Sequence, residues 1–215
     1  PGPGPAPVSG GRRWSGARVA MMALGGLALA VVAVALVFRT AGPHLYRGTV
    51  LQSPDAAPAL DGLTYADGQP VDLAALEGEA VVLFFGYTNC PDVCPTTLST
   101  LAGAVSGLDE GQQDRVEVLM VSVDPERDDL ATLQSYVEFF DPDFRGVGGD
   151  VDAIERAAAV YGVYHQVGET TAGDDYTVDH TATLMGIDTD GRLRVLWPPD
   201  IDREVLAADM AALLS

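Results

Sequence analysis

The stretch AVVLFFGYTNCPDVCP, residues 80–95, joins an apolar run to the two cysteines of the chain, Cys90 and Cys94. The run from Ala80 to Phe85 predicts a buried β-strand, because a short continuous apolar segment suits a strand covered on both faces. With three residues between them, the two thiols share one face if the segment after the strand is helical. Such a pair can close a disulfide after local adjustment, or it can present two sulfur atoms to one metal ion.

The short spacing of the cysteines favours redox or metal chemistry over a structural disulfide. An exported domain with a single cysteine pair often carries a structural disulfide. However, a disulfide stabilises a fold mainly by restricting the unfolded chain, and this effect grows with the length of the loop that it closes. The loop between Cys90 and Cys94 is so short that it contributes little of this stabilisation.

Outward from this stretch, the sequence predicts alternating strands and helices. A strand is expected near residues 49–51, and a small hairpin with a glycine-containing turn at residues 63–73. The other expected strands are 115–123, 181–187 and 193–197, and the expected helices are 95–105, 130–140, 150–161 and 201–214. This order predicts a single α/β sandwich of the thioredoxin type. The cysteines then lie at the first strand-to-helix junction, where a helix N-terminus stabilises thiolates.

The N-terminal part of the sequence predicts a membrane anchor. Residues 19–38 carry no charge and are numerous enough to cross a bilayer as a helix. Arginines precede this segment, whereas the first acidic residue is Asp55. The arginine excess predicts a single-pass protein of the cytoplasmic membrane, with its domain on the extracytoplasmic side. A cleavable signal peptide is the alternative, although its apolar region is usually shorter, about 7–15 residues.

These patterns divide the chain into four parts. Residues 1–18 are rich in proline and glycine and are expected to be disordered and cytoplasmic. Residues 19–38 are the expected anchor, residues 39–60 a linker, and residues 61–215 one thioredoxin-like domain.

The charge of the chain excludes one class of partner. The formal net charge is −19, and all 31 acidic residues follow Phe38, while lysine is absent. So acidic a domain argues against nucleic-acid binding, because phosphates require basic contacts. The charge suits a basic protein partner, the attraction of cations or a saline medium, and it identifies no substrate.

Three segments resemble motifs of the Sco/SenC family of membrane-anchored copper proteins. They are YTNCPDVCP at residues 87–95, VSVDPERD at 121–128 and DYTVDHT at 175–181. They occur in the family's order, and the resemblance covers roughly residues 63–214. It implies a thioredoxin-like domain that binds one copper ion through Cys90, Cys94 and His180.

The resemblance also implies a function. The family is known for helping to assemble the binuclear copper centre of cytochrome c oxidase. The expected protein is thus a membrane-anchored copper metallochaperone, and its partner is the copper-accepting oxidase subunit. It would deliver copper to that centre, reduce the centre's cysteines, or do both. The alternative is a thiol–disulfide reductase that uses Cys90 and Cys94 on partner proteins without delivering copper.

The chemistry of the three candidate ligands is consistent with copper. Soft thiolates favour Cu(I), and an imidazole makes the same site tolerable to Cu(II). Because the ligands must be deprotonated, copper binding should release protons. Copper binding and disulfide formation compete for the same two sulfur atoms.

Three further observations concern the surroundings of the cysteines. Asp124 is a candidate to orient a ligand histidine, or it belongs simply to a loop that leads into a helix. His165 lacks a matching motif and is expected at the surface or partly buried. Thioredoxin-type reductases place a cis-proline opposite their cysteines, but residues 143–197 contain no proline. The corresponding position carries His180, which favours a metal site over general thiol–disulfide exchange.

Overall fold

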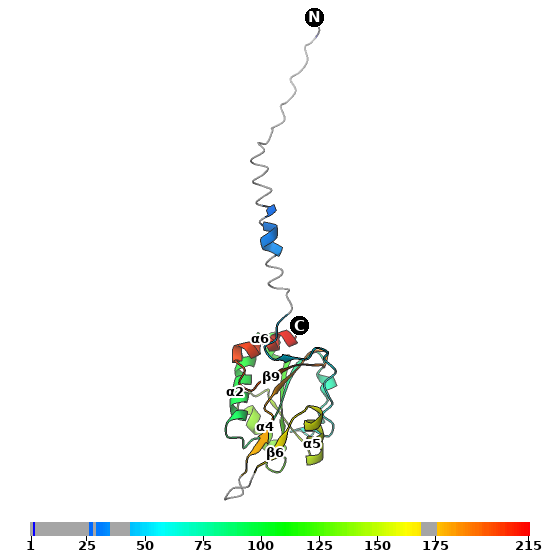
Figure 1. The fold of residues 1–215 in the computed structure, drawn as a ribbon, viewed down its shortest axis with the longest axis vertical. Coiled ribbons are helices and arrows are strands. Elements are labelled where there is room, and N and C mark those ends of the chain that lie inside the picture. The colour runs from blue at the N-terminus through cyan, green and yellow to red at the C-terminus, as the bar shows by residue number, and fades with distance from the viewer. Residues whose placement is uncertain (1, 3–25, 28, 35–43, 169–175) are drawn as a thin grey trace. The chain divides into compact units, whose positions relative to one another are not determined.

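The computed structural model describes residues 2, 26–27, 29–34, 44–168 and 176–215 (Figure 1). The chain divides into two compact units, Pro1–His44 and Leu45–Ser215. Within the predicted anchor at 19–38, the described residues are helical, and the others lie outside the described part of the chain. The predicted disordered segment at 1–18 also lies outside the described part of the chain, apart from Gly2. The described residues include no helix that is both long enough and apolar enough to cross a membrane.

A seven-stranded sheet forms the centre of the second unit, in the order β1-β9-β8-β3-β4-β5-β2. Its middle strand is β3 (Ala80–Gly86), the apolar run of the sequence, and every residue of this strand is buried. On one side, β3 pairs in parallel with β4 (Val116–Ser122). On the other side it pairs antiparallel with β8 (Leu184–Ile187). The apolar run is continuous because both faces of β3 are covered.

The outer strands complete this sheet. β5 (Arg145–Gly148) is parallel to β4, and β9 (Leu193–Trp197) is antiparallel to β8. The edges are β2 (Thr64–Tyr65), which pairs antiparallel with β5, and β1 (Thr49–Val50), which pairs antiparallel with β9. The first strand predicted near residues 49–51 is thus confirmed. Residues 45–60 of the predicted linker belong to the folded unit, since they include β1.

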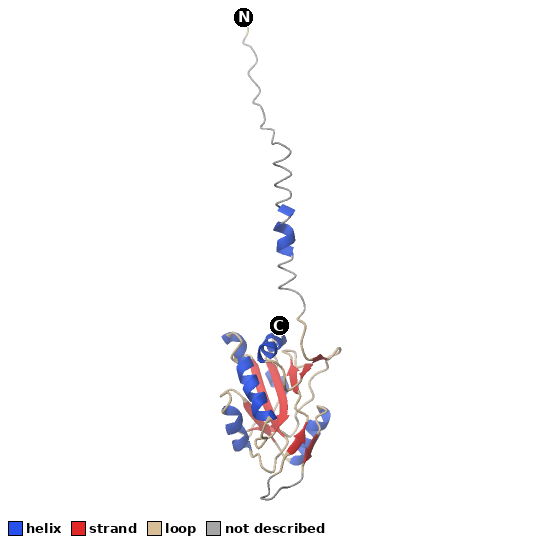
Figure 2. Ribbon diagram, turned by 60° about the vertical axis from the view of Figure 1, so that its left-hand side comes forward, coloured by secondary structure: helices blue, strands red, loops and turns tan. Residues whose placement is uncertain are grey.

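Helices cover both faces of the sheet (Figures 1 and 2). On one face, α2 (Val93–Val105) packs against α6 (Arg203–Leu213). α5 (Val151–Val160) lies on the opposite face, where the Tyr161 ring at its end lies 5.9 Å from that of Phe85. The remaining helices are α4 (Leu130–Glu138), which packs on β5, the short α3 (Glu110–Gln113) and the 3-10 helix η1 (Leu73–Leu76).

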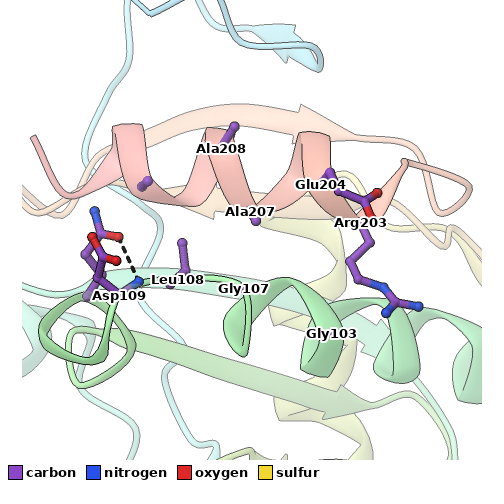
Figure 3. Close-up of a pocket in the computed structure, with 10 residues that line it drawn as sticks. Gly103, Gly107, Leu108, Asp109, Arg203, Glu204, Ala207 and Ala208 are labelled. Carbon is purple, nitrogen blue, oxygen red and sulfur yellow. Dashed lines mark hydrogen bonds between the residues drawn. The ribbon is translucent and has the colours of Figure 1, made fainter.

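Small residues allow α2 and α6 to approach closely. Figure 3 shows the groove between them, with Gly103 of α2 facing Arg203 of α6. A Cβ atom on Gly103 would lie 2.6 Å from the Arg203 Cδ. The absence of a side chain at this position therefore leaves room for the arginine stem.

The predicted α/β architecture is confirmed, but several short strands were not predicted. The sequence patterns missed β5, and the strand expected at 181–187 begins only at Leu184. Before it lies a separate two-stranded sheet, formed by β6 (His165–Val167) and β7 (Val178–His180). We call this pair of strands the ribbon. Its strands are too short to show a hydrophobic period in the sequence.

Candidate metal centre

The two cysteines lie where the central strand leads into α2. Cys90 belongs to the segment between β3 and α2, residues 87–92, which we call the cysteine loop, and Cys94 lies in the first turn of α2. Both are free thiols, with only 7% and 1% of their surface exposed. The Cys94 backbone N–H donates a hydrogen bond to the Cys90 Sγ, with an N–S distance of 3.4 Å. The side chains thus lie together at the start of the helix.

A glycine at the end of β3 leaves room for the second cysteine. A Cβ atom on Gly86 would lie 2.9 Å from the Cys94 Sγ and 2.9 Å from a ring carbon of Phe84. It would also lie 3.1 Å from the Met120 Cε. Such contacts are too short for a stable packing arrangement, so the position of Cys94 depends on the missing side chain at residue 86.

His180 reaches the cysteines from the ribbon. It is the last residue of β7, and its Nε2 lies 3.5 Å from the Cys94 Sγ. Its other ring nitrogen, Nδ1, lies 3.3 Å from the carbonyl oxygen of Thr181. The Tyr87 ring packs edge-on against the imidazole, with a centroid separation of 5.8 Å and an interplanar angle of 87°. With Nδ1 protonated and donating to the carbonyl, Nε2 carries the lone pair that a metal requires.

The structure brings the three predicted ligands into one cluster. The sulfur atoms of Cys90 and Cys94 and a ring nitrogen of His180 all lie within 4.8 Å of one another. Metal bonds to sulfur and nitrogen are roughly 2.0–2.3 Å long, so two donors of one ion lie at most about 4.6 Å apart. Small adjustments therefore suffice for all three atoms to reach one ion. Among the described residues, this is the only cluster of three or more metal-ligating side chains with such spacing.

Burial determines the protonation of the metal-free cluster. It raises the pKa of the Cys94 thiol, and the nearby Cys90 sulfur acts in the same direction. Burial also lowers the pKa of His180, although the Thr181 carbonyl and Asp179 partly offset this effect. The metal-free cluster thus favours a neutral thiol and a neutral imidazole. A metal ion at this cluster would have to displace the thiol proton, whereas the imidazole is already neutral and can bind without losing a proton.

One side of the cluster is open to solvent. A hollow borders it, and its lining includes both Cys90 and His180. Four of the other lining residues are exposed, namely Pro91, Asp92, Thr177 and Asp179. A ligand atom from another molecule can therefore approach the cluster from this side.

The loop after β4 supports the site, but differently from the expectation for Asp124. The Asp124 carboxylate accepts hydrogen bonds from the Tyr176 hydroxyl (2.7 Å) and from the Arg127 Nε. The Nδ1 of His180 instead faces the Thr181 carbonyl, so the hypothesis that Asp124 orients the histidine directly is wrong. Arg127 and Tyr176 were not predicted as site residues, although both lie within segments that resemble family motifs.

Asp128 fixes the cysteine loop from the same side. Its carboxylate accepts hydrogen bonds from the backbone N–H of Thr88 (2.9 Å), the Thr88 hydroxyl and the Ser122 hydroxyl (2.7 Å). These bonds join the loop to the end of β4. The carboxylate is 5% exposed, so its hydrogen bonds replace the water that it loses on burial.

His165 lies outside the cluster. It is the cross-strand partner of His180 in the ribbon, but its Nε2 lies 3.5 Å from the Glu155 carboxylate on α5. Its side chain is 13% exposed, which confirms the expectation of a partly buried residue.

The chain is similar in sequence to the members of one known family. The SCO1/SenC family model matches residues 62–215. The chain is 37% identical over 125 residues to the mitochondrial SCO2 homolog of Mus musculus. The match covers 58% of this chain and 49% of that protein. The chain thus spans about half the length of this relative.

Two solved structures share the fold. ScoI of Bradyrhizobium japonicum, determined with copper bound, is 37% identical and has a TM-score of 0.63. The match covers 74% of this chain and 96% of that one. Apo Sco1 of Thermus thermophilus is 38% identical, with a TM-score of 0.66, over 80% of this chain and 95% of that one. The mixed α/β fold of the second unit is therefore the thioredoxin-like fold of these proteins.

Proposed function

The chain belongs to the SCO1/SenC family, and on this basis we propose that it binds copper and acts in the assembly of cytochrome c oxidase. Cys90, Cys94 and His180 hold the ion in this proposal. The observation that carries it is the approach of their three donor atoms to within 4.8 Å of one another. Two sulfur donors suit Cu(I), and the added imidazole lets the same site accept Cu(II).

Copper is the cargo of the proposed protein. A site with three protein ligands and an open side permits ligand exchange, in which a thiolate of the acceptor enters before the cysteines leave. The hollow bordered by Cys90 and His180 provides the required access. We therefore propose delivery to the copper-accepting subunit of the oxidase as the main role.

A second candidate function is reduction of the acceptor's cysteines. Two features of Cys90 and Cys94 favour it. Both are free thiols, and the Cys94 backbone N–H donates a hydrogen bond to the Cys90 Sγ. A backbone N–H directed at a sulfur suits the attacking thiolate of a thiol–disulfide exchange. In this role, the two thiols become a disulfide as the disulfide of the target is reduced.

The location that we propose follows from the N-terminal sequence. An anchor at residues 19–38, preceded by arginines, holds the domain on the extracytoplasmic side of the cytoplasmic membrane. This places the copper site next to the membrane in which an oxidase resides.

The ligand set is tested by copper titration of the reduced protein and of His180→Ala. We expect one copper ion per chain, and a Cu(II) form with strong sulfur-to-copper charge-transfer absorption. His180→Ala should weaken Cu(II) binding by at least about tenfold and Cu(I) binding much less, because two thiolates still hold the softer ion. His165→Ala is the matched control and should cost much less Cu(II) affinity than His180→Ala, since this histidine lies opposite His180 in the ribbon but outside the cluster.

Equal affinities of wild type and His180→Ala for both copper ions would show that the third ligand is wrong. Delivery and reduction are separated by incubating the copper-accepting oxidase domain with either copper-loaded or metal-free reduced protein. Metal transfer from the loaded form supports delivery. Reduction of the acceptor's disulfide by the metal-free form, without transfer from the loaded form, supports the reductase.

A further inference from the structure

The ribbon that carries His180 is joined to β8 of the main sheet by residues 181–183. Its strands β6 and β7 pair with each other and, among the residues that the structure describes, form no hydrogen-bonded ladder with the seven-stranded sheet. Cys90 follows β3 at the same separation in sequence at which His180 precedes β8, so the absence of ladder bonds is what distinguishes the ribbon. The distance from His180 to the cysteines therefore depends on what holds the ribbon in place.

Tyr176, just before β7, makes two polar contacts with the loop that follows β4. Its hydroxyl donates to the Asp124 carboxylate at 2.7 Å, and its carbonyl accepts from the Arg127 Nη1 at 2.8 Å. The Arg127 guanidinium also lies 3.5 Å from the centroid of the Tyr176 ring. One residue thus contributes its hydroxyl, its ring and its backbone to a single cluster. We call Asp124, Arg127 and Tyr176 the tyrosine latch.

The latch is firmly joined to the main sheet. Asp124 follows β4 closely, is 2% exposed, and its backbone N–H donates to the Ser122 hydroxyl at 3.0 Å. Arg127 pairs with the Asp124 carboxylate. A buried carboxylate is costly unless it is paired and hydrogen-bonded, so Asp124 retains Arg127 and Tyr176 as partners. Movement of Tyr176 away from the loop would leave this carboxylate with fewer partners.

The latch also touches the cysteine loop. The Arg127 guanidinium lies 5.7 Å from the Tyr87 ring, and that ring packs edge-on against His180. Tyr176 stands four positions before His180, and the residue midway between them, Val178, is buried. The segment from the latch to the imidazole is therefore short and fixed at both ends.

We propose that Tyr176 and Arg127 are positioning residues, which hold the ribbon so that the His180 imidazole stays within bonding distance of a metal ion on the two cysteines. The inference rests on the proposed copper site. It adds that the latch sets the affinity for Cu(II), which needs the imidazole, and leaves the affinity for Cu(I) nearly unchanged. Neither residue contacts the metal.

The first test removes one hydroxyl. Tyr176→Phe keeps the ring under Arg127 but loses the bond to Asp124. We expect Cu(II) affinity to fall about fivefold, the equivalent of one hydrogen bond, and Cu(I) affinity to change less than about twofold. The charge-transfer band of the Cu(II) form should also shift, because the imidazole is held less firmly. Tyr164→Phe is the matched control, since this tyrosine lies next to the ribbon and its hydroxyl bonds to Gln166 within it.

The second test keeps the charge and removes the planar contact. Arg127→Lys preserves a cation beside Asp124 but cannot stack on the Tyr176 ring or donate in the same fork. The same loss of Cu(II) affinity without loss of Cu(I) affinity is expected. Equal losses for both ions, or lower thermal stability with both affinities unchanged, would overturn the positioning role.

A metal-free measurement separates this inference from the proposed function. Amide hydrogen exchange of the reduced protein reports opening of the ribbon through Gly168 and Thr181, whose N–H groups donate to the carbonyls of Thr177 and Tyr164. Tyr176→Phe should speed their exchange about fivefold, and Tyr164→Phe should not. Faster exchange supports the latch even if the wild type binds no copper, in which case the proposed function fails alone. Unchanged exchange overturns the latch whatever the protein binds.

Discussion

The cysteine loop and the histidine ribbon meet at one site, but they are held in different ways. The loop directly continues β3, which is paired on both sides, and Asp128 ties it to β4 through Thr88 and Ser122. The ribbon leads into β8, but its two strands pair with each other rather than with the sheet. Side-chain contacts of Tyr176 with Asp124 and Arg127, and of His165 with Glu155, hold it against the rest of the domain. Backbone pairing resists movement more strongly than a few side-chain contacts do.

This difference would suit the proposed role, in which the protein accepts copper and gives it up. Two sulfur atoms on a rigid support keep a constant site for the softer ion, while the third ligand is attached less firmly. Withdrawal of an imidazole converts a site for Cu(II) into one that prefers Cu(I). The comparison therefore predicts that changes in the loop affect both copper ions, whereas changes in the ribbon affect mainly one.

The largest effect is expected from Gly86→Ala, at the end of β3 and directly before the cysteine loop. The new methyl group would lie 2.9 Å from the Cys94 Sγ, so the sulfur or the strand must shift. Overpacking of a core costs about 1–3 kcal/mol. We expect a loss of stability of this size in chemical denaturation. Cu(I) and Cu(II) affinities should both fall about tenfold, because the cysteines serve both ions.

Gly111→Ala is the control for this substitution. Gly111 lies in the short helix α3, and a Cβ atom there would have no neighbour within 4 Å. Alanine is favoured over glycine in helices, so stability should stay the same or rise by up to about 1 kcal/mol. If Gly86→Ala retained full stability and both copper affinities, the cysteine loop would not be the rigid half of the site.

The two halves of the site also differ in how far the sequence predicts them. The cysteine half is visible because the run Ala80–Phe85 is apolar throughout and the thiols follow at helical spacing. Periodicity gives no indication of His180. Only the resemblance of its segment to a family motif singled it out, since a three-residue strand has no recognisable pattern.

The tyrosine latch shows why the rest of the site could not be predicted. Arg127 and Tyr176 stand 49 positions apart and meet only once the ribbon has folded over the loop after β4. Hydrogen bonding and stacking between distant side chains leave no periodic signal in a single sequence. For the same reason, the partner predicted for Asp124 was wrong. The carboxylate was expected to contact the imidazole of His180, but it accepts a hydrogen bond from the Tyr176 hydroxyl in the same segment.

A smaller effect is expected on the alkaline side of the stability profile of the metal-free protein. Burial raises the pKa of the Cys94 thiol above the value of about 8.5 that it has in the unfolded chain. The neutral thiol is thus favoured by folding, and its contribution is complete below pH 8 and declines as the pH rises above about 8.5. Denaturation midpoints under reducing conditions should fall from pH 8 to 9.5, and less steeply in Cys94→Ala. Parallel profiles of the two proteins would contradict this assignment.

The smallest effect is expected on the acid side, and it belongs to the ribbon. Burial lowers the pKa of His180 in the folded, metal-free protein below its unfolded value of about 6.5. Folding thus favours the neutral imidazole, and its contribution is complete above about pH 6.5 and declines as the pH falls below it. His180→Gln should flatten the denaturation midpoints between pH 7 and 5 but leave the alkaline decline unchanged, whereas Cys94→Ala should do the reverse. If both variants altered the same side of the stability profile, acid or alkaline, the loop and the ribbon would respond as one unit. The contrast between a rigid and a loosely held half of the site would then be wrong.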